Sequence, residues 1–217
     1  MEPIARSLLR DTAYDRLRAA IVGGDLAPGA ALRADDLARE LGLSKAPIRD
    51  AITRLSAEGL VETKPQSYTR VTPLVEREVE DAAVVVRAMH DLAVRAVAGG
   101  LSESQLERMR VAGERFSAAV RDGDLDAALA ADDELHAVPV HAYGNTAAAL
   151  TIERFAPLIR RAERLLWASP HGERSIQQHD DLITALATGD QLRAIEINFA
   201  IWGRLRHPGE GETDVPG

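Results

Sequence analysis

Apolar residues recur at helical spacing near the start of the chain. Tyr14, Leu17 and Ile21 share one helical face, a pattern typical of a helix packed against a core. Thr12 stands where an N-cap residue would precede this stripe, and Gly23-Gly24 follows it as a stop signal. The pattern therefore predicts a first helix that begins near Thr12 and ends before Gly23.

Two further helices are predicted after a turn at Leu26–Gly29. A short helix over Ala34–Leu41 ends at Gly42, a residue that tolerates a left-handed cap. Ser44 can cap a third helix that extends to about Glu58, with Pro47 accommodated in its first turn. Its inward stripe consists of Ile48, Ala51, Ile52 and Leu55. Two helices joined by a tight turn, the second with a basic outer face, are typical of a helix-turn-helix.

A β-hairpin is expected next. Leu60–Thr63 and Tyr68–Thr72 are rich in β-prone residues and are separated by the turn-forming segment Lys64–Ser67. Pro73 then closes this first unit. Helices followed by a two-stranded hairpin predict a winged helix-turn-helix over residues 1–73.

The rest of the chain shows only helical patterns. They predict an all-α, six-helix bundle over residues 74–207, and residues 208–217 are expected to form a disordered tail because they are rich in Gly, Pro and Glu. The six segments are about Val75–Ala98, Glu103–Arg121, Leu125–Tyr143, Thr146–Ala168, Glu173–Ala187 and Gln191–Arg206. The expected fold class is thus mostly α, with a winged head and a helical bundle.

Composition narrows the function classes. The chain has no cysteine, which excludes zinc fingers and disulfide frameworks, and any metal would be held by His and carboxylates. No apolar run is long enough to span a membrane and residues 1–10 lack a secretory signal, so the expected compartment is the cytoplasm. The net charge is −8, but residues 1–72 hold 11 Lys and Arg against 10 Asp and Glu, which leaves 15 against 24 for the rest. Only the first unit is suited to approach phosphates.

The outer face of the third helix is a candidate DNA-reading surface. Lys45 and Arg49 lie one turn apart there, and such side chains can donate to guanine in the major groove. Ser44 and the first-turn N–H groups suit a phosphate. The alternative is that these basic residues only face solvent, with their positive charge balanced by Asp50 and Glu58. The other residues predicted to contact DNA are Thr53 on the same helix and Lys64, Gln66 and Arg70 in the wing.

The segments Ile21–Leu32, Leu37–Arg49 and Leu55–Val61 closely resemble the GntR family of transcription regulators. The helical remainder resembles the FCD domain of the FadR-like branch. The resemblance implies that a homodimer reads a short palindrome in double-stranded DNA, with Lys45 and Arg49 at base-contacting positions. Lys45 replaces the family's usual arginine and so loses its bidentate fork, and Ser67-Tyr68 replaces Arg-Gly in the wing.

An Asp-His pair raises the question of a metal site. Asp132 and His136 are four residues apart on one helical face, and His179 could approach them from a later helix. From spacing alone, a surface ion pair is the alternative. The resemblance implies that these three residues correspond to family ligands of one divalent metal. It places Ile201 at the position of the fourth ligand, so water, an effector carboxylate or Asn198 would complete the site. His-rich ligation favours Zn²⁺ or Ni²⁺, and no organic cofactor is expected.

The predicted effector contacts are Arg87, Asn145 and Asn198. The resemblance places Arg87 facing a pocket, where its guanidinium could bind a small carboxylate, although an intrahelical pair with Asp91 is the alternative. Asn145 is more simply interpreted as a turn or cap residue. His90 and His141 lie near the pocket-facing helices, and Trp167 and Trp202 are expected in the core or a dimer interface.

The sequence therefore predicts a ligand-responsive DNA-binding transcription regulator, not an enzyme. The expected activity is that of a repressor released by a small carboxylate, with no membrane partner. One alternative is a metal-dependent hydrolase that uses Asp132, His136 and His179, but no general base or nucleophile stands at a defined spacing. The other is a DNA-binding protein with a ligand-blind bundle, which Ile201 favours.

Overall fold

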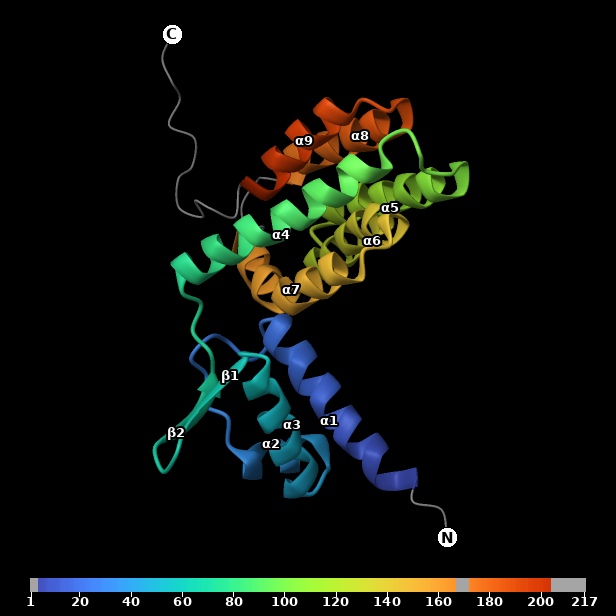
Figure 1. The fold of residues 1–217 in the computed structure, drawn as a ribbon. Coiled ribbons are helices and arrows are strands. Elements are labelled where there is room, and N and C mark those ends of the chain that lie inside the picture. Colours follow the sequence, from blue (N-terminus) through green and yellow to red (C-terminus); the bar gives the residue numbers. More distant parts are fainter. Residues whose placement is uncertain (1–3, 167–171, 204–217) are drawn as a thin grey trace. The chain divides into compact units, whose positions relative to one another are not determined.

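The computed structural model describes residues 4–166 and 172–203, and the chain divides into two compact units, residues 1–75 and 76–217 (Figure 1). The described part of the first unit contains three helices and a two-stranded sheet. Helices alone make up the described part of the second unit. The structure thus confirms the mostly α fold class with a winged head and a helical bundle. No helix among the described residues is long and apolar enough to cross a membrane.

The first helix is longer than the sequence pattern predicts. α1 spans Ile4–Val22, so Thr12 lies inside the helix and is not its N-cap. The apolar stripe begins only where the helix becomes buried, at Ala13, whereas Leu9 one turn earlier is 44% exposed. Periodicity therefore located the packed part of α1 and missed the helical residues that precede it, of which Leu9 to Thr12 are exposed.

α2 (Ala34–Leu41) and α3 (Lys45–Ala57) form the helix-turn-helix. Gly42 ends α2 in the left-handed conformation, with φ 65°. Ser44 occupies the N-cap position of α3 as predicted, but its side chain makes no capping hydrogen bond. Ile48 and Leu55 are fully buried, and they hold α3 in a core shared with α1 and the sheet.

β1 (Val61–Lys64) and β2 (Tyr68–Val71) pair antiparallel, with Val61 opposite Val71. The predicted first strand is displaced by one residue, because the Leu60 N–H donates to the Leu55 carbonyl and so belongs to the end of α3. Gln66 adopts φ 58° at the tip of the hairpin. The wing is therefore a short hairpin whose inner end, at Val61 and Val71, lies in the core of the first unit.

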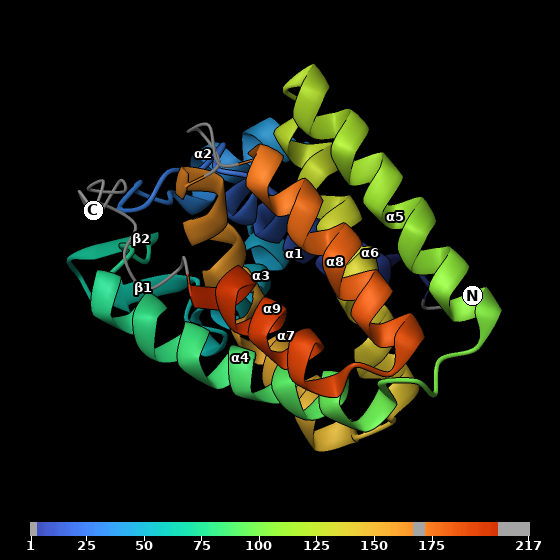
Figure 2. The same cartoon turned by 90° about the horizontal axis from the view of Figure 1, so that it is seen from above.

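The described residues of the second unit form the six predicted helices. Their bounds are α4 Glu76–Val97, α5 Glu103–Asp122, α6 Leu125–Tyr143, α7 Thr146–Leu166, α8 Gly172–Thr188 and α9 Gln191–Gly203. Figure 2 shows α9 between α4 and α8, and both of these helices pack against it. Trp167, the predicted helix ends at Ala168 and Arg206 and the predicted tail lie outside the described residues.

α6 and α7 form an antiparallel hairpin that carries the buried residues Asp132 and His136 on one helix and Glu163 on the other. Gly144 ends α6 with φ 68°, and the Asn145 side chain accepts a hydrogen bond from the Ala148 N–H at the start of α7. Residues close to this turn on α6 therefore face residues close to it on α7. Ion pairs join the far ends, between Asp132 and Arg160 and between Asp126 and Arg164.

Candidate functional sites

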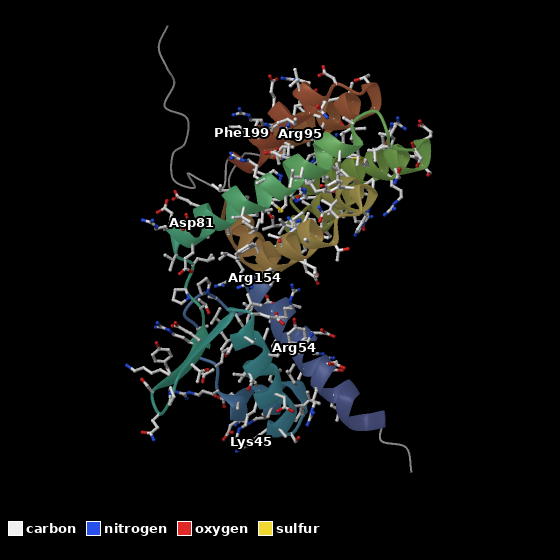
Figure 3. The ribbon with its side chains drawn as sticks, viewed as in Figure 1. Lys45, Arg54, Asp81, Arg95, Arg154 and Phe199 are labelled. Atoms are coloured by element: carbon white, nitrogen blue, oxygen red, sulfur yellow. The ribbon has the colours of Figure 1, made fainter. Side chains whose placement is uncertain are left out.

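The first turns of α3 carry two exposed cationic side chains, Lys45 and Arg49. The Lys45 ammonium lies 2.9 Å from Oδ1 of Asp35 in α2. This hydrogen bond, assisted by the charge of Lys45, lowers the pKa of the Asp35 carboxyl. The Arg49 guanidinium makes no hydrogen bond or ion pair with any side chain in the described part of the chain. Of the two cations, Arg49 therefore has the freer head group. Figure 3 shows the position of Lys45.

Other charged and polar residues of α3 are engaged within the first unit. The Thr53 hydroxyl donates to the Arg49 carbonyl at 2.9 Å. The Arg54 guanidinium lies 3.5 Å from the centre of the Tyr14 ring and is ion-paired with Asp11 at 3.6 Å. Arg54 thus ties α3 to α1, which separates it from the exposed pair at the start of the helix.

In the wing, Lys64 and Gln66 are exposed near the tip, whereas Arg70 is engaged by neighbouring strand residues. Its guanidinium forms an ion pair with Glu62 on the paired strand and lies 4.5 Å from the centre of the Tyr68 ring. The hydrogen bond to Glu62 raises the pKa of Arg70. Arg70 is therefore less available to a ligand than Lys64.

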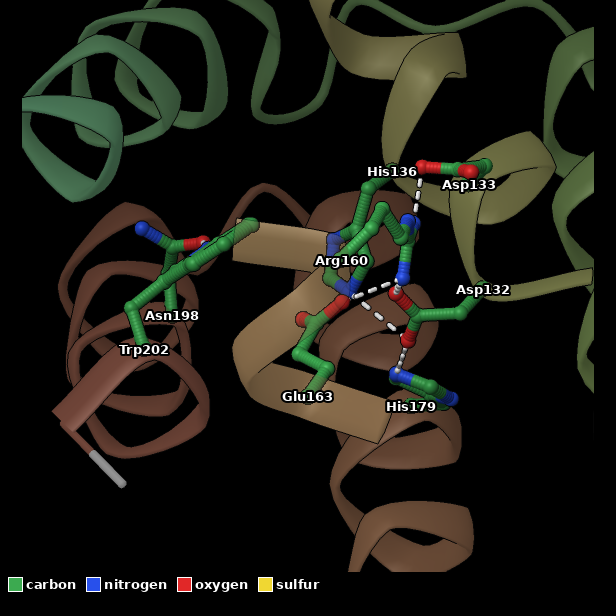
Figure 4. Close-up of polar contacts among 8 residues, drawn as sticks. All are labelled: Asp132, Asp133, His136, Arg160, Glu163, His179, Asn198 and Trp202. Carbon is green, nitrogen blue, oxygen red and sulfur yellow. Dashed lines mark hydrogen bonds and ion pairs between the residues drawn. The ribbon is translucent and has the colours of Figure 1, made fainter. Parts of the chain in front are cut away.

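Asp132, His136 and His179 converge in the bundle, as the sequence predicts. All three are buried, and each offers a ligand atom within 4.8 Å of the others. Oδ1 of Asp132 lies 3.2 Å from Nε2 of His179 and 3.6 Å from Nε2 of His136 (Figure 4). Because Asp132 and His136 are both buried, they do not form the surface ion pair that their spacing also allowed.

The triad fits a divalent cation. Nε2 of His136 is buried, faces Asp132 and has no hydrogen-bond partner, although buried polar atoms are normally satisfied. Burial lowers the pKa of His136 to about 4, against the opposing charge of Asp132, so its imidazole is neutral near pH 7. Two imidazoles and a carboxylate are a common ligand set for Zn²⁺ and related metals. These three residues could therefore hold a metal ion.

Arg160 of α7 is the main partner of this cluster, and the sequence analysis missed it. Its two terminal nitrogens both lie 3.3 Å from Oδ2 of Asp132. It also forms ion pairs with Asp133 and, at 2.5 Å, with Glu163 (Figure 4). Burial opposes ionisation of Asp132, but His136, His179 and Arg160 together hold the pKa of its carboxyl below its usual range. Arg160 thus restrains one oxygen of Asp132 and leaves the other facing the two imidazoles.

A cavity of about 430 Å³ opens beside the triad. It lies between α4, α6 and α7, with Trp202 of α9 also in its wall. Asp132 and His136 line it, whereas His179 does not, so a ligand in the cavity would meet the triad from the side of α6. Its size is in the range of small-molecule sites.

The charges that line this cavity sum to a negative value. Asp132, Asp133 and Glu153 contribute carboxylates, and Arg160 contributes the one guanidinium. Burial lowers the pKa of His90, another lining residue, to about 3, so its imidazole is also neutral near pH 7. The cavity therefore favours a bound cation, and an anion alone would be repelled.

None of the three predicted effector residues lines the cavity. Arg87 lies 4.0 Å from Asp91 and stacks on Phe199, which matches the intrahelical alternative. Asn145 caps α7, as its simpler interpretation had it. Asn198 is fully buried, donates to Asp91 at 2.6 Å and accepts from Trp202 at 3.1 Å. Their predicted role in effector binding has no support from the cavity lining.

The fourth ligand position of the candidate metal site, which the resemblance assigns to Ile201, falls on α9. Ile201 packs against the apolar core of the bundle. Its neighbour Trp202 lies 5.7 Å from His136 between ring centres and stacks on His90 at 4.6 Å. The α9 side chain next to the triad is thus an indole, which offers no free lone pair to a metal ion.

Comparison with known proteins covers both units. Residues 9–71 match the family profile described as bacterial regulatory proteins, gntR family, and residues 81–200 match that of the FCD domain. The chain is 28% identical over 199 residues to the probable D-xylose utilization operon transcriptional repressor of Paenarthrobacter nicotinovorans, covering 88% of this chain and 85% of that protein. It is 26% identical over 179 residues to the transcriptional repressor RspR of Escherichia coli K12, covering 82% and 78%.

Solved structures share the same architecture. Escherichia coli McbR/YncC superposes with a TM-score of 0.78 at 20% identity and covers 90% of this chain and 94% of its own. At that identity the likeness establishes the fold, and it says nothing about which ligand is bound.

Proposed function

The chain belongs to the gntR family of bacterial regulatory proteins and is a transcription regulator with an FCD ligand-binding domain, and we propose that a small effector in the α4–α6–α7 cavity controls its affinity for DNA. The observation that carries the proposal is the buried Asp132–His136–His179 triad at the wall of that cavity. The family and these relatives are regulators, and we infer that the chain is not an enzyme and acts in the cytoplasm, on genomic DNA.

We propose that the exposed start of α3 reads base edges in the major groove. Arg49, with its unengaged guanidinium, would donate to guanine O6 and N7, and Lys45 would add a second cation one turn earlier. Ser44 and Thr53 on α3 and Lys64, Gln66 and Arg70 in the wing would contact the backbone, Arg70 only after release from Glu62. A homodimer would place two such helices on a short palindrome.

Selection of bound genomic fragments by the full chain would supply an operator for the test of this assignment. Arg49→Ala should weaken binding to that operator by about 1–3 kcal/mol per base contact and reduce discrimination against unrelated duplex. Arg95→Ala is the matched control, because Arg95 is an exposed arginine of α4 in the other unit. Equal losses for both variants would contradict a base-reading role for Arg49.

We further propose that Asp132, His136 and His179 hold one divalent cation, Zn²⁺ or Ni²⁺. Its chemistry there would be that of a Lewis acid that attracts an anionic group from the cavity. Elemental analysis should find metal in the wild type and much less in His179→Ala. His141→Ala, which removes an exposed histidine of α6, should retain it. Equal metal content in the two variants would overturn the assignment.

The effector would be a small carboxylate that completes the metal site and releases a repressor from its operator. Two features support this: the cavity reaches Asp132 and His136, and the neighbouring Trp202 supplies no fourth ligand. The effector would shift the relative orientation of the two winged heads of a dimer, so that both recognition helices no longer meet successive grooves. Loss of operator binding on addition of a carboxylate, with Zn²⁺ present, is the expected result.

A further inference from the structure

The cavity beside the triad is polar at one end and apolar at the other. Its lining extends along α6 from Asp132 to His141, a stretch of nine residue steps that spans about 14 Å at about 1.5 Å rise per residue. Because α6 and α7 are antiparallel, Arg160 stands at the Asp132 end, and Ala149 stands at the other end, close to the Gly144 turn. A ligand that fills the cavity would therefore extend from the triad toward the hairpin turn.

Apolar side chains dominate the part that lies away from the triad. Val140 is buried there, and Ala149, Ile152 and Ala156 are partly buried. The polar residues of this stretch, His141 and Glu153, are exposed, so their polar groups can reach solvent. The covered surface at this end offers few partners for hydroxyl groups, and a polyhydroxylated ligand would lose hydrogen bonds to water on entering.

We propose that the effector is amphipathic, with a head group at the triad and an unbranched or flat apolar body that lies between α6 and α7 toward the hairpin turn. This inference deepens the proposed function and rests on it for the location of the effector site. It specifies the ligand class: a monocarboxylate with a hydrocarbon body is bound, and a sugar acid of equal length is rejected. Burial of each methylene should tighten binding by roughly fourfold, since it contributes about 0.8 kcal/mol.

Calorimetry on the full, zinc-loaded chain tests the inference with acetate, butyrate, hexanoate, octanoate and gluconate. Affinity should rise about fourfold per methylene along the linear acids until the cavity is filled, and gluconate should bind no better than acetate. Affinity that is independent of chain length, or a preference for gluconate, would overturn the inference. Hexylamine is tested alongside as the control for head-group charge: binding of hexylamine without binding of hexanoate would overturn the carboxylate head.

Ala149→Leu would locate the apolar end. The added side chain should shorten the cavity, so that octanoate and hexanoate lose on the order of tenfold while acetate and butyrate keep their affinity. Ala147→Leu, an exposed position of the same helix, is the control and should leave the whole series unchanged. A uniform loss across the series would refute the placement, because general destabilisation of α7 does not depend on chain length.

Operator binding in the same preparations separates the two levels of the proposal. Intact operator binding without any dependence on chain length would overturn only the inference about the effector body. If the folded wild-type chain does not bind the operator even without any added acid, that result would instead count against the proposed function itself.

Discussion

Arg160 and Asp132 are joined through one oxygen of the carboxylate: both terminal nitrogens of the guanidinium lie 3.3 Å from Oδ2. The other oxygen, Oδ1, faces His179 and His136. Arg160 therefore does not compete with a metal for Oδ1. It orients the carboxylate and neutralises part of its charge.

Arg160→Gln should destabilise the metal-free protein and increase the stabilisation that metal provides. Removal of the guanidinium leaves Asp132 and Glu163 buried without their cation, which costs on the order of 3–5 kcal/mol. A bound divalent ion would then neutralise Asp132 in its place. Thermal unfolding with and without Zn²⁺ measures both effects.

Arg115→Gln provides the comparison for this prediction. Arg115 forms a 2.5 Å ion pair with Glu134, but both side chains are more than half exposed, so its loss should cost well under about 1 kcal/mol. If Arg160→Lys, which retains the charge, restores the metal-free stability, the effect is electrostatic. A metal-induced shift in Tm that is smaller in Arg160→Gln than in the wild type would contradict the proposed role.

The sequence led to the triad but not to Arg160 or Glu163. Asp132 and His136 stand out because they share one helical face, and the family resemblance supplied His179. Arg160 lies among several arginines of α7, and helical periodicity does not distinguish a buried cation from a solvated one. The antiparallel hairpin provides the missing relation, because it places Arg160 against Asp132 across the turn at Gly144. That relation depends on how two helices pack, which no local pattern contains.

In the winged head, too, local sequence patterns predicted the helices but not the contacts between them. The bounds of α2 follow from its cap and stripe, and the structure confirms Ala34–Leu41. The pairing of Lys45 with Asp35, by contrast, depends on the angle between two helices. Similarly, the sequence does not show that Asn198 already has hydrogen-bond partners. In the bundle its side chain donates to Asp91 and accepts from Trp202.

Asp35→Asn should strengthen binding to duplex DNA of any sequence. The substitution removes a carboxylate from beside Lys45 and leaves the ammonium free to contact a phosphate. One additional phosphate contact would steepen the slope of log K against log salt by about 0.9. Fluorescence anisotropy at several salt concentrations measures that slope. Asp36→Asn is the matched control, because the neighbouring Asp36 pairs with Arg39 instead; an equal change in both variants would indicate a general effect of charge.

Glu163→Gln should flatten the dependence of stability on pH. Burial raises the pKa of Glu163 from 4.5 to about 7; Arg160 opposes this shift, and Asp132 and Asp133 add to it. The folded state thus keeps this proton to higher pH than the unfolded state does. Its contribution to stability is complete below about pH 4.5 and is lost as pH rises through about 7.

Urea denaturation of the metal-free chain at about pH 5 and about pH 8 tests this sign. Between these two pH values, the free energy of unfolding should fall by roughly 1–3 kcal/mol more in the wild type than in Glu163→Gln. Glu134→Gln, which removes an exposed carboxylate, should follow the wild type. A wild-type stability that rises over the interval by more than that of Glu163→Gln would show that Glu163 is ionised throughout, held so by Arg160.

Carboxylate binding should require metal, because the lining charges of the cavity sum to a negative value. Without a divalent ion, a carboxylate head would approach Asp132 and Asp133 with only Arg160 as a cation, and Arg160 is already shared among three carboxylates. Zinc should therefore tighten the binding of hexanoate at least about tenfold, a coupling of typical size. By linkage, hexanoate must tighten the binding of zinc by the same factor. Calorimetry in both orders of addition measures the two factors. His179→Ala should abolish the coupling, whereas equal hexanoate affinity with and without zinc in the wild type would mean that the head group is held by Arg160 alone.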